Sequence, residues 1–464
     1  MIQSSVKILF CNDNADSIVA SAGRISTTKG SADEIYAKSC ERDMSENNAL
    51  IQKIIASGHT SVLEHVFFNL SFNNVSVFVE QFIIEFRLAS FTVKSRRYVD
   101  FGKMGYVFPE MESYHENADA IKEIYQNHMN YLFEEYNDML DKGIPKEDAR
   151  FVLPYSFRSN FYCTVNAREL VKIVSEMIWG RGSRYPEIVL LGESILEQCK
   201  NTVPFLKFSE EKYEEDIFEN IILDQNDKDE LTDISEEPVV LLDSTESPEE
   251  VICRAAMMKV GIENWNQISV KNTNLQKQIL KKILCNSRKR ELEQANFTIL
   301  FQNVSLAGVT HLVRHRMQSI VIPEYISACD YSKYIVPDSV VSAGLSEKYT
   351  SVFKRTEDVV NQLKEKGLKE CDQVYLLLSG LTIPIITTMN ANELFTFIRL
   401  RSCNRAQWEI ADDAKQLLKI LRQKHPILFS LYGPACYATG KCPEGKMTCG
   451  QMDKIKEMFD SNKY

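Results

Sequence analysis

Leu63-Glu64-His65 is followed after nineteen residues by Glu85-Phe86-Arg87-Leu88-Ala89-Ser90, and Leu292-Glu293-Gln294 is followed after nineteen residues by Arg314-His315-Arg316-Met317-Gln318-Ser319. Both elements of the second stretch lie 229 residues after those of the first (293 − 64 and 314 − 85). Equal offsets across two elements indicate an internal repeat. A repeat determines the architecture of the whole chain, so it takes precedence over the pattern of any single element. We therefore interpret the chain as two copies of one sequence.

Further stretches set the limits of the copies. Asn166-Ala167-Arg168-Glu169-Leu170 recurs as Asn390-Ala391-Asn392-Glu393-Leu394 at an offset of 224 (390 − 166), and short insertions and deletions explain the change. A chain of 464 residues also exceeds what one hydrophobic core usually organises. We predict a first copy at 1–208, a linker at 209–237, a second copy at 238–433 and a cysteine-containing tail at 434–464.

The sequence patterns predict both strands and helices in each copy. Strand patterns cover 6–10, 66–72, 239–243 and 297–301, and helical patterns cover 117–142, 346–366 and 405–424. A further helix is expected between an N-cap at Ser45 and a stop at Gly58. Asn166 and Asn390 each precede a Glu by three residues, a capping-box spacing that opens a helix. The predicted class is α+β, with each copy a mixed sheet flanked by helices.

Composition excludes several classes of protein. The chain is 44% hydrophobic and 25% charged, as in ordinary globular proteins. A net charge of −10 argues against general binding to polymeric nucleic acid, so any phosphate site must be local.

No apolar run or signal-peptide pattern indicates a membrane protein or export, so we expect a cytoplasmic protein with mostly reduced cysteines. Residues 209–237 are rich in Asp and Glu, which favours a solvated linker over a surface helix in its first half.

Arg314-His315-Arg316 places three hydrogen-bond donors at adjacent positions, and guanidinium groups suit phosphate and ring carbonyl oxygens. A basic cluster that ends a buried helix is the alternative interpretation. The surroundings add Gly58-His59-Thr60-Ser61-Val62-Leu63-Glu64-His65 in copy one, and Asn392-Glu393-Leu394 with Arg401-Ser402-Cys403-Asn404-Arg405-Ala406-Gln407-Trp408-Glu409-Ile410 in copy two. This combination resembles the flavin-dependent thymidylate synthases over nearly all of 1–205 and 238–450.

The resemblance implies an enzyme that converts dUMP to dTMP by reductive C5 methylation. It implies FAD as cofactor, recharged by NADPH, and methylene-tetrahydrofolate as the carbon donor, with a small-molecule nucleotide as substrate. Because the family assembles as tetramers of single copies, it also implies a homodimer of this double chain. The cofactor-binding positions it implies are Ser26, His59, Ser61, Glu64, Asn166, Arg168, Arg314, His315, Arg316 and Asn390. The substrate-binding positions it implies are Ser95, Arg96, Arg97, Arg150, His311, Arg314 and Arg401.

Each copy keeps only part of the family's motifs. Copy one keeps the nucleotide loop Ser95-Arg96-Arg97-Tyr98 and Arg150, but it has lost the Arg-His-Arg triplet and has Met177 where copy two has Arg401. Copy two keeps the triplet and Arg401, but it has no counterpart of Arg150. In the family the nucleotide site lies between subunits. We therefore hypothesise one complete site shared by the two copies, with Arg401, assisted by Arg314, as the catalytic cation, because a cation beside N3 and O4 activates the pyrimidine.

Alternatives remain at several positions. His59 could be a core histidine, Asn166 and Asn390 could act only as helix caps, and Arg405 could be a solvated helix residue. Val93 and His311 stand where the family usually has Glu and Gln, so another pyrimidine nucleotide such as UMP is a second candidate substrate. A catalytically inactive nucleotide-binding or scaffold protein is the third candidate.

Three cysteines lie close together in the tail. Cys436, Cys442 and Cys449 could bind zinc, with Cys403 or His425 as a fourth ligand. Their spacing is looser than a paired Cys-x-x-Cys site, which favours reduced, unligated thiols, so we predict no metal.

Overall fold

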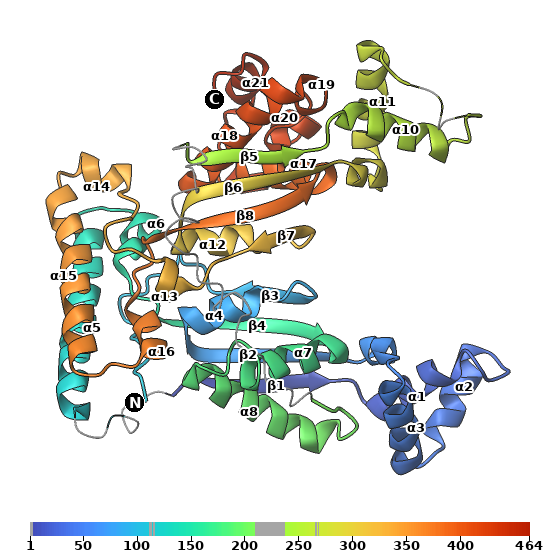
Figure 1. Ribbon diagram of the computed structural model, residues 1–464, viewed down its shortest axis with the longest axis horizontal. Helices are drawn as coiled ribbons and strands as arrows, with labels where there is room; N and C mark the ends of the chain where they lie inside the picture. The colour runs from blue at the N-terminus through green and yellow to red at the C-terminus, as the bar shows by residue number, and fades with distance from the viewer. Residues whose placement is uncertain (1–2, 111–113, 115–116, 209–236, 265–266, 268) are drawn as a thin grey trace, which may run out of the picture. The chain divides into compact units, whose positions relative to one another are not determined.

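The structure is a computed structural model that describes residues 3–110, 114, 117–208, 237–264, 267 and 269–464. Apart from Glu237, the predicted linker lies outside these residues. The described residues form two compact units (Figure 1). Unit 1 holds the residues up to 208 together with Val336–Gly380, and unit 2 holds those from 237 to Ile335 together with Leu381–Tyr464.

Unit 1 is built on a four-stranded antiparallel sheet in the order β1-β2-β4-β3. The strands are β1 Ser5–Cys11, β2 Phe67–Ser76, β3 Ala89–Val93 and β4 Arg158–Asn166. Phe68, Leu70 and Phe72 of β2 are buried at alternate positions, as a strand with one face toward the core requires. Phe72 lies opposite Phe161 of β4, and the two rings stack with centroids 4.5 Å apart. The core of unit 1 therefore begins at this face of the sheet.

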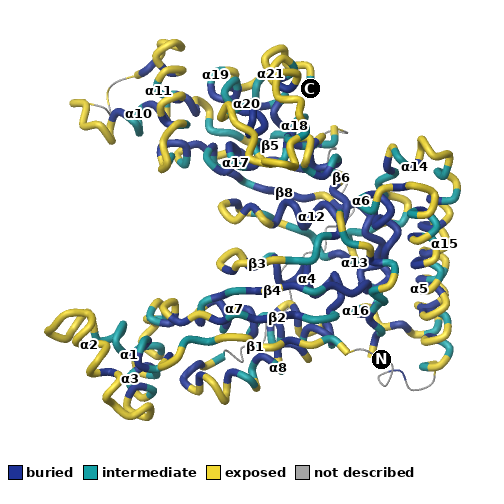
Figure 2. Tube along the Cα trace, turned by 180° about the vertical axis from the view of Figure 1, so that it is seen from behind, coloured by how far each residue is buried: buried dark blue, intermediate teal, exposed yellow. Residues whose placement is uncertain are grey.

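The helices of unit 1 come from both copies. Those of copy one are α1 Ala15–Arg24, α2 Ala32–Cys40, α3 Met44–Ala56, α4 Val77–Ile84, α5 Ala118–Asp141, α6 Lys146–Ala149, α7 Ala167–Ile178 and α8 Pro186–Thr202, with 3-10 helices η1 Thr60–His65 and η3 Arg150–Val152. Those of copy two are α14 Asp338–Ser342, α15 Ser346–Glu365, α16 Glu370–Gln373 and the 3-10 helix η5 Val374–Leu376. Figure 2 shows α2 largely exposed and β4 largely buried.

Unit 2 repeats the sheet in the equivalent order β5-β6-β8-β7, again antiparallel throughout. The strands are β5 Val239–Ser244, β6 Asn296–Ser305, β7 Gln318–Val321 and β8 Thr382–Asn390. Phe297 and Phe301 are buried on β6, each 229 residues after its counterpart, Phe68 or Phe72. The helices are α10 Pro248–Lys259, α11 Thr273–Cys285, α12 Leu306–Leu312, α13 Tyr325–Ala328, α17 Ala391–Arg401, α18 Trp408–Lys424, α19 Pro426–Phe429, α20 Ala435–Thr439 and α21 Met452–Asp460, with 3-10 helices η4 Arg290–Gln294 and η6 Gly445–Met447.

The predicted α+β class with two related copies is confirmed. The sheets are antiparallel rather than mixed in strand direction, because each connection returns the chain so that neighbouring strands run in opposite directions. The cap predicted at Ser45 is also wrong. The helix α3 begins at Met44 after Asp43, whose extended backbone makes it the N-cap, and Ser45 lies within the first turn. Of the described residues, no helix has the length and apolar character needed to cross a membrane.

A segment of copy two is part of the core of unit 1. Helix α15 of copy two lies beside α5 of copy one (Figure 1). Lys348 Nζ lies 2.6 Å from Asp138 Oδ2, and His128 Nε2 lies 3.1 Å from the Thr356 hydroxyl. Lys348 comes before Thr356 in α15, whereas its partner Asp138 comes after His128 in α5, so the two helices are antiparallel. The two copies are therefore joined inside one compact unit.

The copies also pair through matching backbone segments. Tyr155 N donates to Leu377 O at 2.8 Å, and Gly380 N donates to Phe151 O at 2.8 Å. Between them Pro154 bridges Leu378, its own counterpart at the offset of 224 (378 − 154). Equivalent residues meet in this way at the centre of an interface between related subunits. The contact inside unit 1 therefore has the form of a pseudo-dimer contact between the copies.

Candidate functional site

The nucleotide loop of copy one follows β3 and brings two predicted substrate residues together. Arg97 Nε donates to Glu147 Oε2 at 2.9 Å, and Arg150 Nε donates to Glu147 O at 3.0 Å. Ser95 Oγ accepts a hydrogen bond of 3.4 Å from Arg97 N within the loop. Glu147 was not singled out from the sequence, although it stands three residues before Arg150. It holds the two guanidinium groups in one place.

Arg96, also a predicted substrate residue, points elsewhere. Its Nη2 lies 2.6 Å from Glu80 Oε1, and the two side chains are 5% and 0% exposed. Glu80 also accepts a hydrogen bond from the Ser159 hydroxyl. The pair lies inside the fold at the start of α4, so the Arg96 guanidinium faces protein groups rather than solvent.

Most of the predicted cofactor residues of copy one gather where η1 packs against the start of α7. Arg168 Nη1 lies 2.6 Å from Glu64 Oε1, with half-exposed side chains, and His59 and Ser61 are exposed on or beside η1. Asn166 Oδ1 accepts from Glu169 N at 2.9 Å, so Asn166 caps α7, as the capping-box spacing predicted. Ser26 lies in the exposed turn after α1. Exposed donors at a helix N-terminus suit an anionic group such as a phosphate.

In unit 2 the Arg-His-Arg triplet lies between α12 and β7. Arg314 and Arg316 are exposed, whereas His315 is 4% exposed. Arg401, at the end of α17, donates from Nε to His315 Nε2 at 3.0 Å. His315 Nδ1 lies 2.9 Å from Glu393 Oε1 in the first turn of the same helix. The structure thus joins the triplet to Arg401 through a buried histidine, and the participation of Glu393 was not expected.

The charge state of His315 follows from its surroundings. Burial lowers the pKa of His315 below its ordinary value, and the Arg401 cation lowers it further, against the opposing effect of Glu393. The neutral ring has one donor nitrogen and one acceptor nitrogen. Nε2 therefore accepts from Arg401 and Nδ1 donates to Glu393.

The comparison with known proteins bears on both copies. The family model described as thymidylate synthase complementing protein matches residues 7–205 and again residues 240–427. The chain belongs to this family. The resemblance drawn from the motifs is confirmed, with its duplication, and so is the prediction of an enzyme, a methyltransferase of this type.

Relatives within the family correspond to single copies. The flavin-dependent thymidylate synthase of Geobacter sulfurreducens is 34% identical over 232 residues, which cover 48% of this chain and 97% of the relative. That of Clostridium tetani is 30% identical over 244 residues, which cover 48% of this chain and 96% of the relative. The crystal structure of a UMP/dUMP methylase from Streptomyces cacaoi superposes with a TM-score of 0.38 at 23% identity, over 44% of this chain and 92% of the other.

Compared with copy two, copy one of this family member lacks the polar connection around Arg401. The residues equivalent to His315 and Arg401 are Phe86 and Met177, and both are buried. Phe86 packs against Phe82, with ring centroids 5.9 Å apart. Glu169 occupies the position of Glu393 and receives the same cap. The copies have therefore diverged at two of these three positions.

His311, the position where the family usually has Gln, lies on α12 and is 8% exposed. Val93, where the family usually has Glu, ends β3 and is half-buried. Val93 lies in unit 1 and His311 lies in unit 2. Val has no polar group where the family usually has the Glu carboxylate, and His has ring nitrogens where the family usually has the Gln amide.

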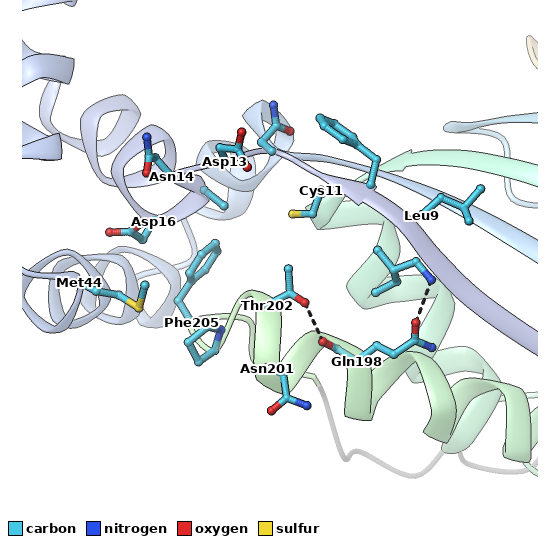
Figure 3. Close-up of a pocket in the computed structure, with 15 residues that line it drawn as sticks. Leu9, Cys11, Asp13, Asn14, Asp16, Met44, Gln198, Asn201, Thr202 and Phe205 are labelled. Atoms are coloured by element: carbon cyan, nitrogen blue, oxygen red, sulfur yellow. Dashed lines mark hydrogen bonds between the residues drawn. The ribbon is translucent and has the colours of Figure 1, made fainter.

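A hollow of about 570 Å³ lies in unit 1, away from the predicted site residues (Figure 3). It is lined by β1, the start of α1 and the end of α8. Gln198 Oε1 accepts from Ile8 N at 2.8 Å and Gln198 O accepts from the Thr202 hydroxyl at 3.0 Å along its wall. None of the residues predicted to bind nucleotide or cofactor lines this hollow.

The cysteines of the tail lie near the turn that follows α17. Cys436 is buried, Cys442 is exposed and Cys449 is half-buried. Arg405 Nε donates to Met447 O at 2.6 Å, which ties the tail to that turn. Within the described ranges, no group of three or more His, Cys, Asp or Glu side chains is arranged to hold a metal ion.

Proposed function

We propose that this chain catalyses the FAD-dependent reductive C5 methylation of dUMP to dTMP, with methylene-tetrahydrofolate and NADPH, at one nucleotide site shared by the two copies. The substrate residues are Ser95, Arg97 and Arg150 of copy one with Arg314 and Arg401 of copy two. The relatives named flavin-dependent thymidylate synthases support the reaction type.

One observation carries the proposal of a shared site. The copies retain complementary arginines, and they pair as a pseudo-dimer inside unit 1. Arg150 begins η3, and the equivalent position at the start of η5 is Val374. Phe151, the next residue, accepts the hydrogen bond from Gly380 of copy two. Since Arg150 lies where the copies pair and has no basic counterpart, only one of the two possible nucleotide sites is proposed to be complete.

The protein's own groups bind and polarise the nucleotide. Arg97 and Arg150, both hydrogen-bonded to Glu147, are proposed to bind its anionic part. Arg401 is proposed to lie beside N3 and O4, where a cation favours the N3-deprotonated ring and raises electron density at C5. The C5 hydrogen is then replaced by a methyl group whose carbon comes from the folate.

The donors around η1 and α7 fit a flavin dinucleotide. Arg168 in the first turn of α7 and His59 and Ser61 at the start of η1 are exposed, and a pyrophosphate there would be stabilised by backbone N–H groups. Asn390 caps α17 in the same way and would serve mainly to order the start of that helix. When bound, the reduced flavin supplies the hydride that completes the methyl group.

Single alanine substitutions test the shared site. Arg150→Ala and Arg401→Ala should each abolish tritium release from C5-labelled dUMP, because each removes a cation from the one complete site. Arg87→Ala should leave turnover largely intact, since Arg87 belongs to the incomplete site. Loss of activity in Arg87→Ala together with activity in Arg401→Ala would show that the assignment is wrong.

A second candidate substrate is UMP, favoured by Val93 and His311. Both positions differ from the family pattern, so a contact that discriminates the ribose could differ as well. Assays with C5-labelled dUMP and UMP at equal concentrations distinguish the two. Release from dUMP alone supports the first proposal, and release from UMP at a similar or higher rate supports the second.

The proposed assembly is a homodimer of the double chain. Static light scattering of the purified protein should then give twice the mass of 53.3 kDa. A monomeric mass across the micromolar range would contradict it.

A further inference from the structure

We propose that His315 and Glu393 are positioning residues that orient the guanidinium group of Arg401 for its work on the pyrimidine. The inference rests on the proposed function, in which Arg401 faces the ring. It adds to that function a buried pair of side chains that act on the substrate only through Arg401.

The geometry forms a continuous line of hydrogen bonds. Arg401 Nε donates to His315 Nε2 at 3.0 Å, and the opposite ring nitrogen lies 2.9 Å from Glu393 Oε1. Glu393 is held in turn, because its backbone N–H donates to Asn390 Oδ1 at 2.9 Å. The line therefore begins at a fixed helix cap and ends at the guanidinium group.

Packing prevents the histidine from turning away. The side chains of His315 and Glu393 are 3% and 9% exposed. The ring of Phe397 meets the His315 ring edge to face, with centroids 5.1 Å apart. A ring packed in this way holds one orientation, so its Nε2 presents one acceptor direction to Arg401.

A bond to Nε is well suited to orienting an arginine. The guanidinium group is planar and its donors have fixed relative directions. A hydrogen bond from Nε to His315 fixes the direction of that edge of the group and restricts its rotation, while the outer Nη donors remain for other partners. A cation aimed in advance at the site of developing charge stabilises a transition state without having to reorganise.

The histidine must be neutral to do this. A doubly protonated ring has no acceptor and would place a second positive charge beside Arg401. Glu393 accepts from Nδ1 and so selects the tautomer whose lone pair lies on Nε2. The pair thus holds the one form of histidine that can accept the Arg401 hydrogen bond.

Copy one provides an internal comparison. Phe86 stands at the position of His315 and is 7% exposed, so the fold accepts a purely apolar ring there. Met177 stands at the position of Arg401. The imidazole is therefore present in the copy that has the arginine and absent in the copy that lacks it, which a packing role alone does not explain.

The test uses full-length protein, four single variants of the pair and its control position, and an Arg401→Lys background. His315→Phe introduces the residue that copy one has at this position, and His315→Gln keeps a hydrogen-bond acceptor for Arg401. Glu393→Gln weakens the hydrogen bond that holds the His315 ring. Glu169→Gln is the matched control, because Glu169 has the same cap and its copy has Phe86 at the position of His315. Melting temperature, kcat and KM for dUMP are measured for each.

A positioning role predicts a specific pattern. His315→Phe should lower kcat by about 10- to 100-fold with KM changed less than about threefold, since misplacement of a catalytic group acts on turnover. Glu393→Gln and His315→Gln should show smaller losses of kcat, and Glu169→Gln should behave like the wild type. In an Arg401→Lys background, His315→Phe should cause no further loss, because the Nε donor is already gone.

Three results would overturn the inference. One is wild-type kcat in His315→Phe. The second is an equal loss of kcat in Glu393→Gln and Glu169→Gln. The third is a full additional loss of kcat when His315→Phe is added to Arg401→Lys. The activity of the wild-type protein distinguishes failure of this inference from failure of the proposed function. A wild-type protein that methylates neither dUMP nor UMP overturns the proposed function itself.

Discussion

Arg96 and Arg97 are neighbours in one loop, yet their side chains have different partners and different surroundings. Arg96 lies in a buried ion pair with Glu80, whereas the Arg97 pair with Glu147 is about one-fifth exposed at both side chains. A buried charge that loses its partner is costly, while a partly exposed charge is solvated by water. Of two adjacent arginines, Arg96 is therefore paired inside the fold, whereas the Arg97 pair remains partly exposed to solvent.

Arg96→Ala should lower the free energy of unfolding by about 3–5 kcal/mol, because it leaves the Glu80 carboxylate buried without its counter-charge. Arg42→Ala is the control, since Arg42 pairs with Glu46 on an exposed helix turn and its loss should cost less than about 0.5 kcal/mol. Urea unfolding measures both. An Arg96→Ala protein of wild-type stability that no longer binds nucleotide would instead make Arg96 a substrate residue.

At the scale of elements, the antiparallel pair α5 and α15 connects the copies. It combines partly exposed ion pairs with a buried polar contact. Lys348 lies within 2.9 Å of both Glu135 and Asp138, at the edge of the pair. His128 and Thr356 lie between the helices, with His128 only 2% exposed. The buried histidine makes this contact sensitive to acid.

The stability of the α5 and α15 pair should fall in acid because of His128. Burial, with a smaller contribution from Arg355, lowers the pKa of His128 from 6.5 to about 4. As the pH falls from 6.5 to about 4, the unfolded chain takes up a proton that the folded chain refuses, so stability is lost across this window. The loss is on the order of 3 kcal/mol.

Urea unfolding at pH 7 and pH 4.5 measures this loss. His128→Asn, which has no titrating ring, should lose less stability between the two pH values than the wild type does. Carboxylates titrate equally in both proteins and cancel in the comparison. Equal losses would show that His128 does not control the acid response.

At the scale of the whole molecule, the compact units do not coincide with the repeats. Copy two contributes Val336–Gly380 to unit 1, where this segment packs on α5 and pairs with 151–155 of copy one. Tyr155 and Phe151 are fully buried there. Copy one alone would expose this apolar surface to water, which costs roughly 25 cal/mol per Å².

Two separate polypeptides, 1–222 and 223–464, should therefore associate when they are produced together. The first should be poorly folded when it is produced alone, because residues 336–380 are missing from its core. An affinity tag on one polypeptide and size-exclusion chromatography of the captured material measure the association. A cooperative urea transition for 1–222 alone would contradict the prediction.

The sequence by itself determined the duplication, the α+β class and some of the elements. Equal offsets, alternating apolar residues and cap spacings are local signals, and they placed β2, β6, α5, α15 and the caps Asn166 and Asn390 within a few residues. It also identified the family, because donor types at fixed spacings reflect the ligand chemistry that they serve. None of these inferences needed to know which distant residues touch.

The tertiary structure decided what depends on such contacts. Glu80 lies 16 residues before Arg96, and Glu393 lies 78 residues after His315, so no local pattern revealed either partner. The inclusion of Val336–Gly380 in unit 1 was equally hidden, since a helix pattern predicts an apolar face but not the helix that will cover it. Burial and pairing across the chain set these features, because the free energy of a charge or an apolar face depends on what surrounds it.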